Sequence, residues 1–302
     1  MFEKIDLFIY LCYFFKYMKR LFFFIILIFF QLFYFEAQAK NVVYIVVEGV
    51  SRDTLYSLIN KNKLPNYQKI ISRGNYRNLS IENSELKNNE STFLLYNGVL
   101  SSEYISTSFF EYLAEAQPSL NIKCFLSTPI SKEYNINTEA SLIQHIELTG
   151  SNPLQYLRSI DIGNSVANFI SKNTDEFFFM INFTNVDYVG WRYREGAVLY
   201  SQALLNTDRA IGKIIDALED KNLFEETEFL ITTNYGYHMK TQLRKAEGWV
   251  VSSRKALRKG NLNDIYPSLV DLLDLKNTID FPLFEGKTLF EPIQNPLAIE
   301  VR

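Results

Sequence analysis

Cysteine and histidine are scarce in this chain, with two of each among 302 residues. Cys12 lies in the apolar amino-terminal region, so removal of that region would leave Cys124 as a single thiol. A domain with one thiol has no internal disulfide and depends on its hydrophobic core for stability. The histidines, His145 and His238, are far apart in the sequence, and an isolated histidine is more often a turn or packing residue than a metal ligand.

An excess of positive charge is also absent, because 31 Lys and Arg face 34 Asp and Glu for a net charge of -3. The basic residues are spread along the chain. Their one modest cluster is typical of a solvated helix face and consists of Arg254, Lys255, Arg258 and Lys259. The sequence therefore offers no basic face for nucleic acid, and we expect no nucleic-acid partner.

Hydrophobic residues are abundant and make up 47% of the chain, including 25 Phe and 19 Tyr. That content suffices for one sizeable core, and the length fits a single large α/β domain.

The amino-terminal 39 residues have the three parts of a secretory signal peptide. Met18-Lys19-Arg20 provides the charged region, residues 21–35 the apolar region, and Ala37-Gln38-Ala39 the cleavage site. Residues 5–15 are also apolar, so an uncleaved membrane anchor, or an upstream start with Met18 as the true one, is the alternative. We therefore divide the chain into a signal peptide or anchor (1–39) and a domain (40–302). We expect an exported protein of the periplasm or cell envelope that meets the membrane only through its amino-terminal segment.

Residues 42–50 read Val-Val-Tyr-Ile-Val-Val-Glu-Gly-Val, an apolar run that stops at Glu48-Gly49. Such a run predicts a strand buried on both faces of a parallel sheet. Open α/β sheets place their ligands at the carboxyl ends of such strands, which makes Glu48 a candidate metal ligand or catalytic acid. The alternative is an ordinary solvated carboxylate in a turn.

Further strands alternate with helical patterns along the chain. We expect strands at 121–126, 177–183, 227–233 and 249–251, and helices at 67–73, 103–116, 161–171, 197–221 and 264–275. This alternation predicts an α/β domain with a mainly parallel central sheet and helices on both faces.

Five motifs follow one another in a set order along the chain. They are residues 42–50 with Leu64-Pro65-Asn66, residues 185–191 before a long helix, Ile231-Thr232-Thr233-Asn234-Tyr235-Gly236, residues 264–269, and Gly286-Lys287-Thr288-Leu289. In this order they resemble the alkaline phosphatase superfamily, and most closely its type I phosphodiesterase and nucleotide pyrophosphatase branch. The resemblance covers nearly all of residues 40–302.

The resemblance implies a two-metal hydrolase, in which paired cations held by carboxylates and imidazoles clamp the reacting oxygens. This chain departs from that pattern. Glu48 replaces an Asp, Asp187 is kept, and Trp191 replaces a His. Asn234 and Tyr235 stand where the family has Asp-His. We interpret Glu48, Asp187 and Asn234 as vestigial metal positions and Trp191 and Tyr235 as pocket residues, with Trp191 filling the space left by a metal.

The nucleophile of the family is a Thr or Ser ten residues before the glycine that corresponds to Gly98. Counting back gives Asn88, which cannot form a phosphoenzyme, although Ser91 and Thr92 are nearby hydroxyls. The final family histidine has no counterpart here. About 26 residues separate His238 from Asp264, so the usual substrate-lobe insertion is missing as well.

These losses favour a catalytically degenerate binding or structural protein of the cell envelope that needs no metal cofactor. Its partner would be an anionic small molecule or an envelope protein, and Arg52, Arg192 and Arg194 are candidates to hold a phosphate or sulfate. The alternative is a divergent phosphodiesterase, phosphatase or sulfatase-type hydrolase of phosphate or sulfate esters. That enzyme would keep one divalent cation (Zn or Mn) on Glu48 and Asp187. A third hypothesis is a subunit that completes another protein's site.

Overall fold

The computed structural model describes residues 41–81, 109–127, 143–146, 159–173, 175–236, 247–275 and 286–290, together with Met18, Phe22 and Leu95. The chain divides into two units, Met1–Gln38 and Ala39–Arg302. The fold below is that of the second unit. Within the described part of the chain, no helix combines the length and the hydrophobicity needed to cross a bilayer.

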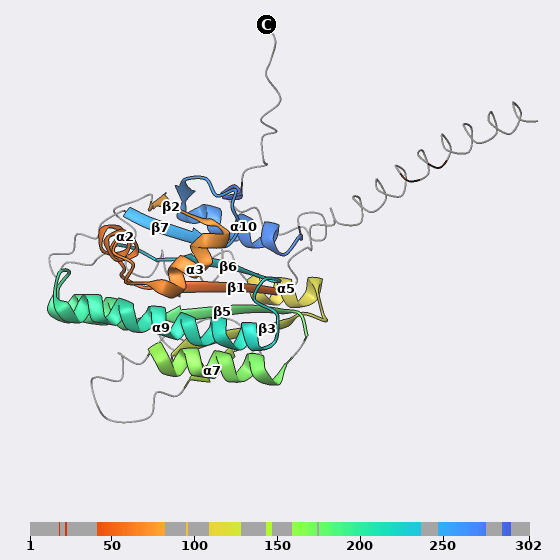
Figure 1. The fold of residues 1–302 in the computed structure, drawn as a ribbon, viewed down its shortest axis with the longest axis horizontal. Helices are drawn as coiled ribbons and strands as arrows, with labels where there is room; N and C mark the ends of the chain where they lie inside the picture. Colours follow the sequence, from red (N-terminus) through yellow and green to blue (C-terminus); the bar gives the residue numbers. More distant parts are fainter. Residues whose placement is uncertain are drawn as a thin grey trace, which may run out of the picture. The chain divides into compact units, whose positions relative to one another are not determined.

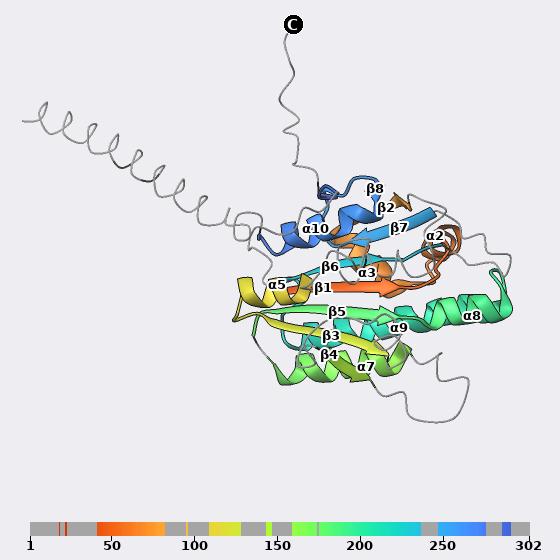
Figure 2. The ribbon, with the colours of Figure 1, turned by 180° about the vertical axis from the view of Figure 1, so that it is seen from behind.

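A sheet in the order β4-β3-β5-β1-β6-β7-β2-β8 organises the described residues (Figures 1 and 2). Its strands are β1 (Asn41–Val47), β2 (Asn75–Ser80), β3 (Asn121–Ser127), β4 (Ile143–Ile146), β5 (Phe177–Phe183), β6 (Thr227–Thr232), β7 (Glu247–Ser252) and β8 (Gly260–Asn261). The strands from β4 to β6 run parallel, whereas β7 is antiparallel to both β6 and β2. The predicted mainly parallel α/β fold is confirmed.

β1 is the central parallel strand, paired with β5 on one side and β6 on the other. All seven of its residues are buried, because the two faces of the sheet are both covered. Val43, Ile45 and Val47 point into one core, whereas Val42, Tyr44 and Val46 point into the other. The uninterrupted apolar sequence of β1 follows from this double burial.

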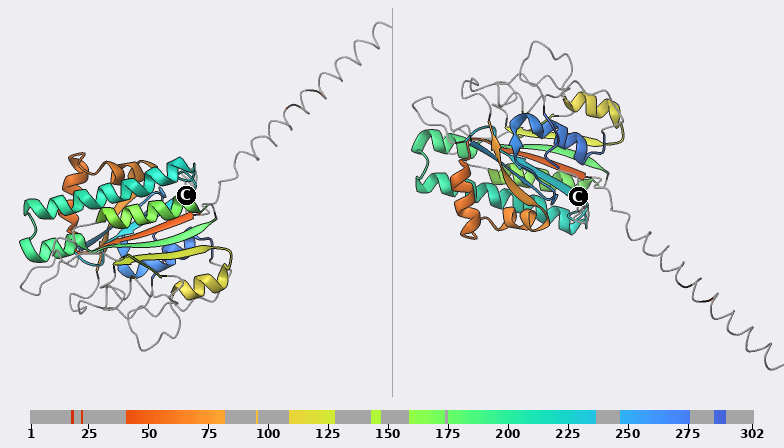
Figure 3. Two further views of the ribbon diagram at one scale, coloured as in Figure 1. Left: turned by 90° about the horizontal axis from the view of Figure 1, so that it is seen from below. Right: turned by 90° about the horizontal axis from the view of Figure 1, so that it is seen from above.

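Helices form a layer on each face of the sheet (Figure 3). The first core packs against α2 (Arg52–Asn60), α3 (Pro65–Arg73), α7 (Ser159–Lys172), α8 (Asn185–Tyr193) and α9 (Val198–Asp220). The second packs against α5 (Phe109–Ala116) and α10 (Ile265–Leu272), which follows a 3-10 turn, η3 (Leu262–Asp264). Cys124 of β3 lies in the second core, and burial raises the pKa of its thiol far above the ordinary value.

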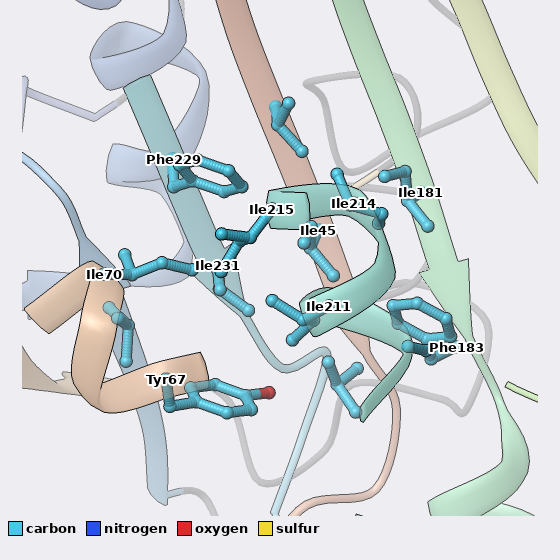
Figure 4. Packing of buried hydrophobic residues seen from close by; sticks show 14 of the residues in the cluster. Ile45, Tyr67, Ile70, Ile181, Phe183, Ile211, Ile214, Ile215, Phe229 and Ile231 are labelled. Atoms are coloured by element: carbon cyan, nitrogen blue, oxygen red, sulfur yellow. The ribbon is translucent and has the colours of Figure 1, made fainter. Parts of the chain in front are cut away.

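α9 is the long amphipathic helix that the sequence predicts, and it lies across the first face. Ile211, Ile214 and Ile215 contact the sheet beside Ile45 and Ile231 (Figure 4). Their spacing of three and four residues puts them on one helix face, as the pattern requires.

A carboxylate on α9 also caps α3. Asp208 is 2% exposed, and its oxygens accept hydrogen bonds from the Asn66 N–H at 3.1 Å and the Tyr67 N–H at 3.0 Å. α3 begins at Pro65 and has no cap from its own preceding side chain. Asp208 therefore satisfies amide groups that every helix leaves open at its start, and burial raises the pKa of its carboxyl.

The sequence patterns did not predict several elements or their exact bounds. β2 is a mostly polar, half-buried strand, and α2 and α8 are short helices next to strand ends. α10 ends at Leu272 rather than residue 275. The expected helix at 103–116 is described only from Phe109, so its proposed start lies outside the described residues. The connection from β6 to β7 spans residues 233–246.

Replacing the α9 cap should destabilise the fold. We expect Asp208→Ala to lower the free energy of unfolding by about 2 kcal/mol, because it leaves the first amide groups of α3 buried without an acceptor. Equilibrium unfolding in guanidinium chloride measures the change. Asp216→Ala, at an exposed position of the same helix, is the matched control and should change it little. Equal effects of the two substitutions would contradict the capping role.

Candidate functional site

The turn after β1 carries the first predicted site residue. The Glu48 N–H donates to the Phe183 carbonyl at 2.9 Å, which continues the pairing with β5 by one residue. Gly49 then adopts a left-handed φ of +67°. A Cβ on Gly49 would lie 2.7 Å from the Asp187 Cα, so α8 packs directly against this turn. Only glycine allows both the backbone angle and the close approach.

Side chains from three other elements hold the same turn. The Tyr200 hydroxyl donates to the Gly49 carbonyl at 2.8 Å and accepts from the Ser51 N–H at 2.9 Å. The Trp249 indole N–H donates to the Val50 carbonyl at 3.0 Å. The Asn234 Oδ1 accepts from the Gly49 N–H at 3.2 Å. The turn is therefore fixed from α9, β7 and the end of β6.

Glu48 is directed toward β5 and is only 5% exposed. Its Oε1 accepts a hydrogen bond of 2.7 Å from the Nδ2 of Asn182, which is fully buried. The other amide atom of Asn182, Oδ1, has no hydrogen-bond partner among the described residues. Asn182 was not anticipated as a site residue, although it is the single polar residue in the apolar run 177–183 and could have been found on that ground.

Asn234 is fully buried at the end of β6, and its Oδ1 also accepts from the Tyr235 N–H at 3.0 Å. The parallel pairing of β1 with β5 and β6 brings Glu48, Asp187 and Asn234 to one edge of the sheet. Asp187 lies on the first turn of α8 and is partly exposed. The predicted convergence of these three segments at the carboxyl edge is present.

The donor set at this edge does not fit a zinc site. Zinc needs at least three protein ligands, usually including imidazole or thiolate. Within the described ranges, no group of three His, Cys, Asp or Glu side chains could hold a metal ion. Glu48 and Asp187 are the two carboxylates, and Asn182 and Asn234 contribute neutral amides.

The two predicted pocket residues differ in position. Tyr235 is 6% exposed and directly follows Asn234. Trp191 is 47% exposed, so the expectation that its indole fills a space left by a metal is wrong. The physical reason is that residues 185–193 form a helix, α8, whose buried side is Asn185, Val186, Val189 and Gly190. α8 extends beyond the carboxyl edge of the sheet (Figure 2), and Trp191 lies in its last turn.

The three candidate anion-binding arginines have different surroundings. Arg52 forms an ion pair of 2.9 Å with Glu247 and lies 3.8 Å from an Asp53 oxygen, so its charge is already balanced. Arg192 and Arg194 are exposed at the far end of α8.

The nucleophile candidates Asn88, Ser91 and Thr92 lie outside the described residues, as do His238 and the side chain of His145. Leu95, three positions after Thr92, is described and buried. Its carbonyl accepts from the Tyr266 hydroxyl at 2.9 Å.

Residues 128–271 match the family model described as Type I phosphodiesterase / nucleotide pyrophosphatase. Among solved structures, the chain is similar to an alkaline phosphatase from the Antarctic bacterium TAB5, with 12% identity over 78% of this chain and 98% of that one and a TM-score of 0.58. A 2-O GAG sulfatase has 12% identity over 82% of this chain and 73% of that one, with a TM-score of 0.61.

A protein in the alkaline phosphatase superfamily from Vibrio parahaemolyticus has 14% identity, covers 85% of this chain and 71% of its own, and has a TM-score of 0.57. No curated protein matches the chain. The resemblance inferred from the motifs is confirmed, and at these identities the solved structures establish the fold alone.

The cost of the close contact between Gly49 and Asp187 can be measured by comparing alanine substitutions at Gly49 and at a second glycine with positive φ. We expect Gly49→Ala to lower the free energy of unfolding by about 3 kcal/mol, since it adds a backbone penalty and a clash with Asp187. Gly196→Ala also places alanine at positive φ, +87°, but nothing lies within 4 Å of the new Cβ, so it should cost only about 1 kcal/mol. Chemical denaturation of both variants isolates the contact with Asp187, and equal losses would disprove it.

Proposed function

We propose that this chain, which has the fold of the alkaline phosphatase superfamily, is an exported and catalytically degenerate relative of those hydrolases. Its role is that of a binding or structural protein of the cell envelope. The observation that carries the proposal is the use of the polar side chains at the carboxyl edge. They hold the backbone and each other, whereas a two-metal hydrolase directs them at cations.

Asn234 supports this proposal most directly. Its side-chain oxygen accepts from two backbone amides, those of Gly49 and Tyr235. As a neutral amide it supplies none of the negative charge that would offset a divalent cation. Glu48 likewise accepts from the Asn182 amide at 2.7 Å. Residues that a metal site would need thus serve to shape the turn after β1.

Export is supported by the sequence of residues 18–39, with its charged, apolar and small-residue parts. The apolar run at 21–35 is shorter than the roughly 20 residues that a spanning helix prefers, which favours a signal peptide over an anchor.

A second candidate function is the one-cation hydrolase, and one observation favours it. The Asn182 Oδ1 is buried without a partner beside Glu48. Buried polar atoms are nearly always paired, so this oxygen is available to a cation or a water. Carboxylate and carbonyl oxygens are hard donors that suit manganese better than zinc. Ser91 or Thr92 would then supply the nucleophile.

Metal analysis and a turnover assay distinguish the two candidates. We expect the full chain, purified without chelators, to carry substoichiometric zinc and manganese. We also expect its hydrolysis of bis(4-nitrophenyl) phosphate to equal that of Glu48→Gln, because no complete ligand set is present among the described residues. Asp216→Asn, which removes an exposed carboxylate elsewhere, controls for the change in charge.

The one-cation hydrolase predicts different results. The chain would purify with about one manganese ion, and added manganese at 100 times its Kd would stabilise the fold by about 2.7 kcal/mol. Glu48→Gln would abolish both that stabilisation and the turnover, and Asp216→Asn would abolish neither. That pattern would overturn the proposal of a degenerate site.

A further inference from the structure

The junction of α8 and α9 concentrates exposed apolar side chains. Among the described residues of the unit Ala39–Arg302, the large hydrophobic residues with high exposure are Trp191 at 47%, Tyr193 at 46%, Val198 at 84% and Leu199 at 46%. We call residues 191–199 the α8–α9 tip. Scattered apolar residues are normal on protein surfaces, but a contiguous group marks an interaction site.

Two arginines alternate with the aromatic residues of the tip in the sequence Trp191-Arg192-Tyr193-Arg194. Both are exposed, and neither guanidinium has an ion-pair or hydrogen-bond partner within the described ranges. The neighbouring Glu195 accepts a hydrogen bond at its Oε1 from the Thr54 hydroxyl of α2 at 3.2 Å. Within the described ranges, the tip therefore combines exposed aromatic residues with two exposed arginines that have no partner.

The backbone of Arg194 has a strained conformation. Its φ of 77° and ψ of 158° lie in a region that is essentially restricted to glycine. Such conformations persist where the surrounding structure or the function requires the residue. Within the described ranges the Arg194 guanidinium has no partner that would require this strained conformation, which leaves it accessible to a ligand outside the chain.

We propose that the α8–α9 tip is a docking surface for a bilayer that contains anionic phospholipids. Trp and Tyr favour the interface between lipid and water, where the ring is buried and the polar atom stays hydrated. Arginine binds phosphate through two parallel hydrogen bonds. Val198 and Leu199, on the first turn of α9, supply aliphatic side chains that enter the headgroup boundary.

Docking at the tip would add a second membrane contact to the one expected through residues 1–39. β1 and β5 are parallel, and the chain enters the sheet at Asn41, at the amino end of β1. The tip follows the carboxyl end of β5, through α8. The start of the domain and the tip therefore lie at opposite edges of the sheet (Figure 3). The inference goes beyond the proposed function and holds whether or not the carboxyl edge is catalytic.

The native tryptophans provide the experiment. The chain has two, and Trp249 is fully buried, so an environment-dependent change in emission reports on Trp191. We expect the full chain, mixed with vesicles of phosphatidylglycerol and phosphatidylcholine, to shift its emission to shorter wavelength. Brominated acyl chains should quench that emission. Phosphatidylcholine alone should give little quenching, and salt should weaken the effect by screening.

Charge variants test the role of the arginines. Arg192→Gln/Arg194→Gln should weaken docking of the tip roughly 30-fold, because each arginine near an anionic surface contributes about equally to the binding free energy. Arg209→Gln/Lys213→Gln removes the same charge from exposed positions of α9 beyond the tip and should dock like the unmodified chain. Arg194→Gly separates folding from docking, because it should raise the melting temperature while weakening docking.

Several outcomes would overturn the proposal. One is the absence of any quenching by brominated lipids. Another is quenching of equal strength with both vesicle types and in both double variants, which would mean that the amino-terminal segment alone brings Trp191 near lipid. A third outcome is that sedimentation equilibrium shows a dimer, that Val198→Ser/Leu199→Ser dissociates this dimer, and that vesicles do not change the Trp191 emission. That result would identify the tip as an interface between two copies of the chain. Cross-linking of the tip to an envelope protein, again without a lipid effect, would assign it to a protein partner.

Discussion

The close approach of α8 to the turn after β1 is the constraint on which the carboxyl edge depends. Gly49 leaves no room for a side chain between the turn and Asp187, and its carbonyl and N–H are both bound by side chains from other elements. Because those side chains come from α9 and from the end of β6, the turn joins parts of the fold that are far apart in the sequence. Among the described residues, the junction fixes Asp187, Asn234 and Tyr200 relative to the turn.

The same junction explains why the site differs chemically from that of a two-metal hydrolase. A cation site needs oxygens and nitrogens whose lone pairs converge on one point in space. Here the Asn234 oxygen faces two backbone amides, and the Glu48 carboxylate faces the Asn182 amide. The hydrogen bonds favour a rigid turn, and Asn234, as a neutral amide, adds no negative charge to the edge. Among the described residues at this edge, the Asn182 Oδ1 is a buried oxygen without a hydrogen-bond partner, and its chemistry suits a cation.

The parallel core was predictable because burial on both faces leaves an unmistakable apolar run, as in β1 and β5, and because α9 repeats its apolar positions every three or four residues. Strand β2 could not be predicted from the sequence, because a half-buried antiparallel strand carries polar residues such as Asn75 and Arg77. The position of Trp191 could not be derived from its motif alone. Its exposure depends on α8 continuing past the sheet edge, and the pairing of Arg52 with Glu247 likewise depends on tertiary contacts.

Cys124 gives the domain a built-in probe of its own integrity. The thiol is 1% exposed within the second core, and its raised pKa keeps it protonated. Since the thiolate is the species that reacts with oxidants, metals and alkylating agents, this sulfur is inert while β3 stays in the sheet. Its rate of alkylation therefore reports how often the sheet opens around β3, and that frequency measures cooperative stability without any added label.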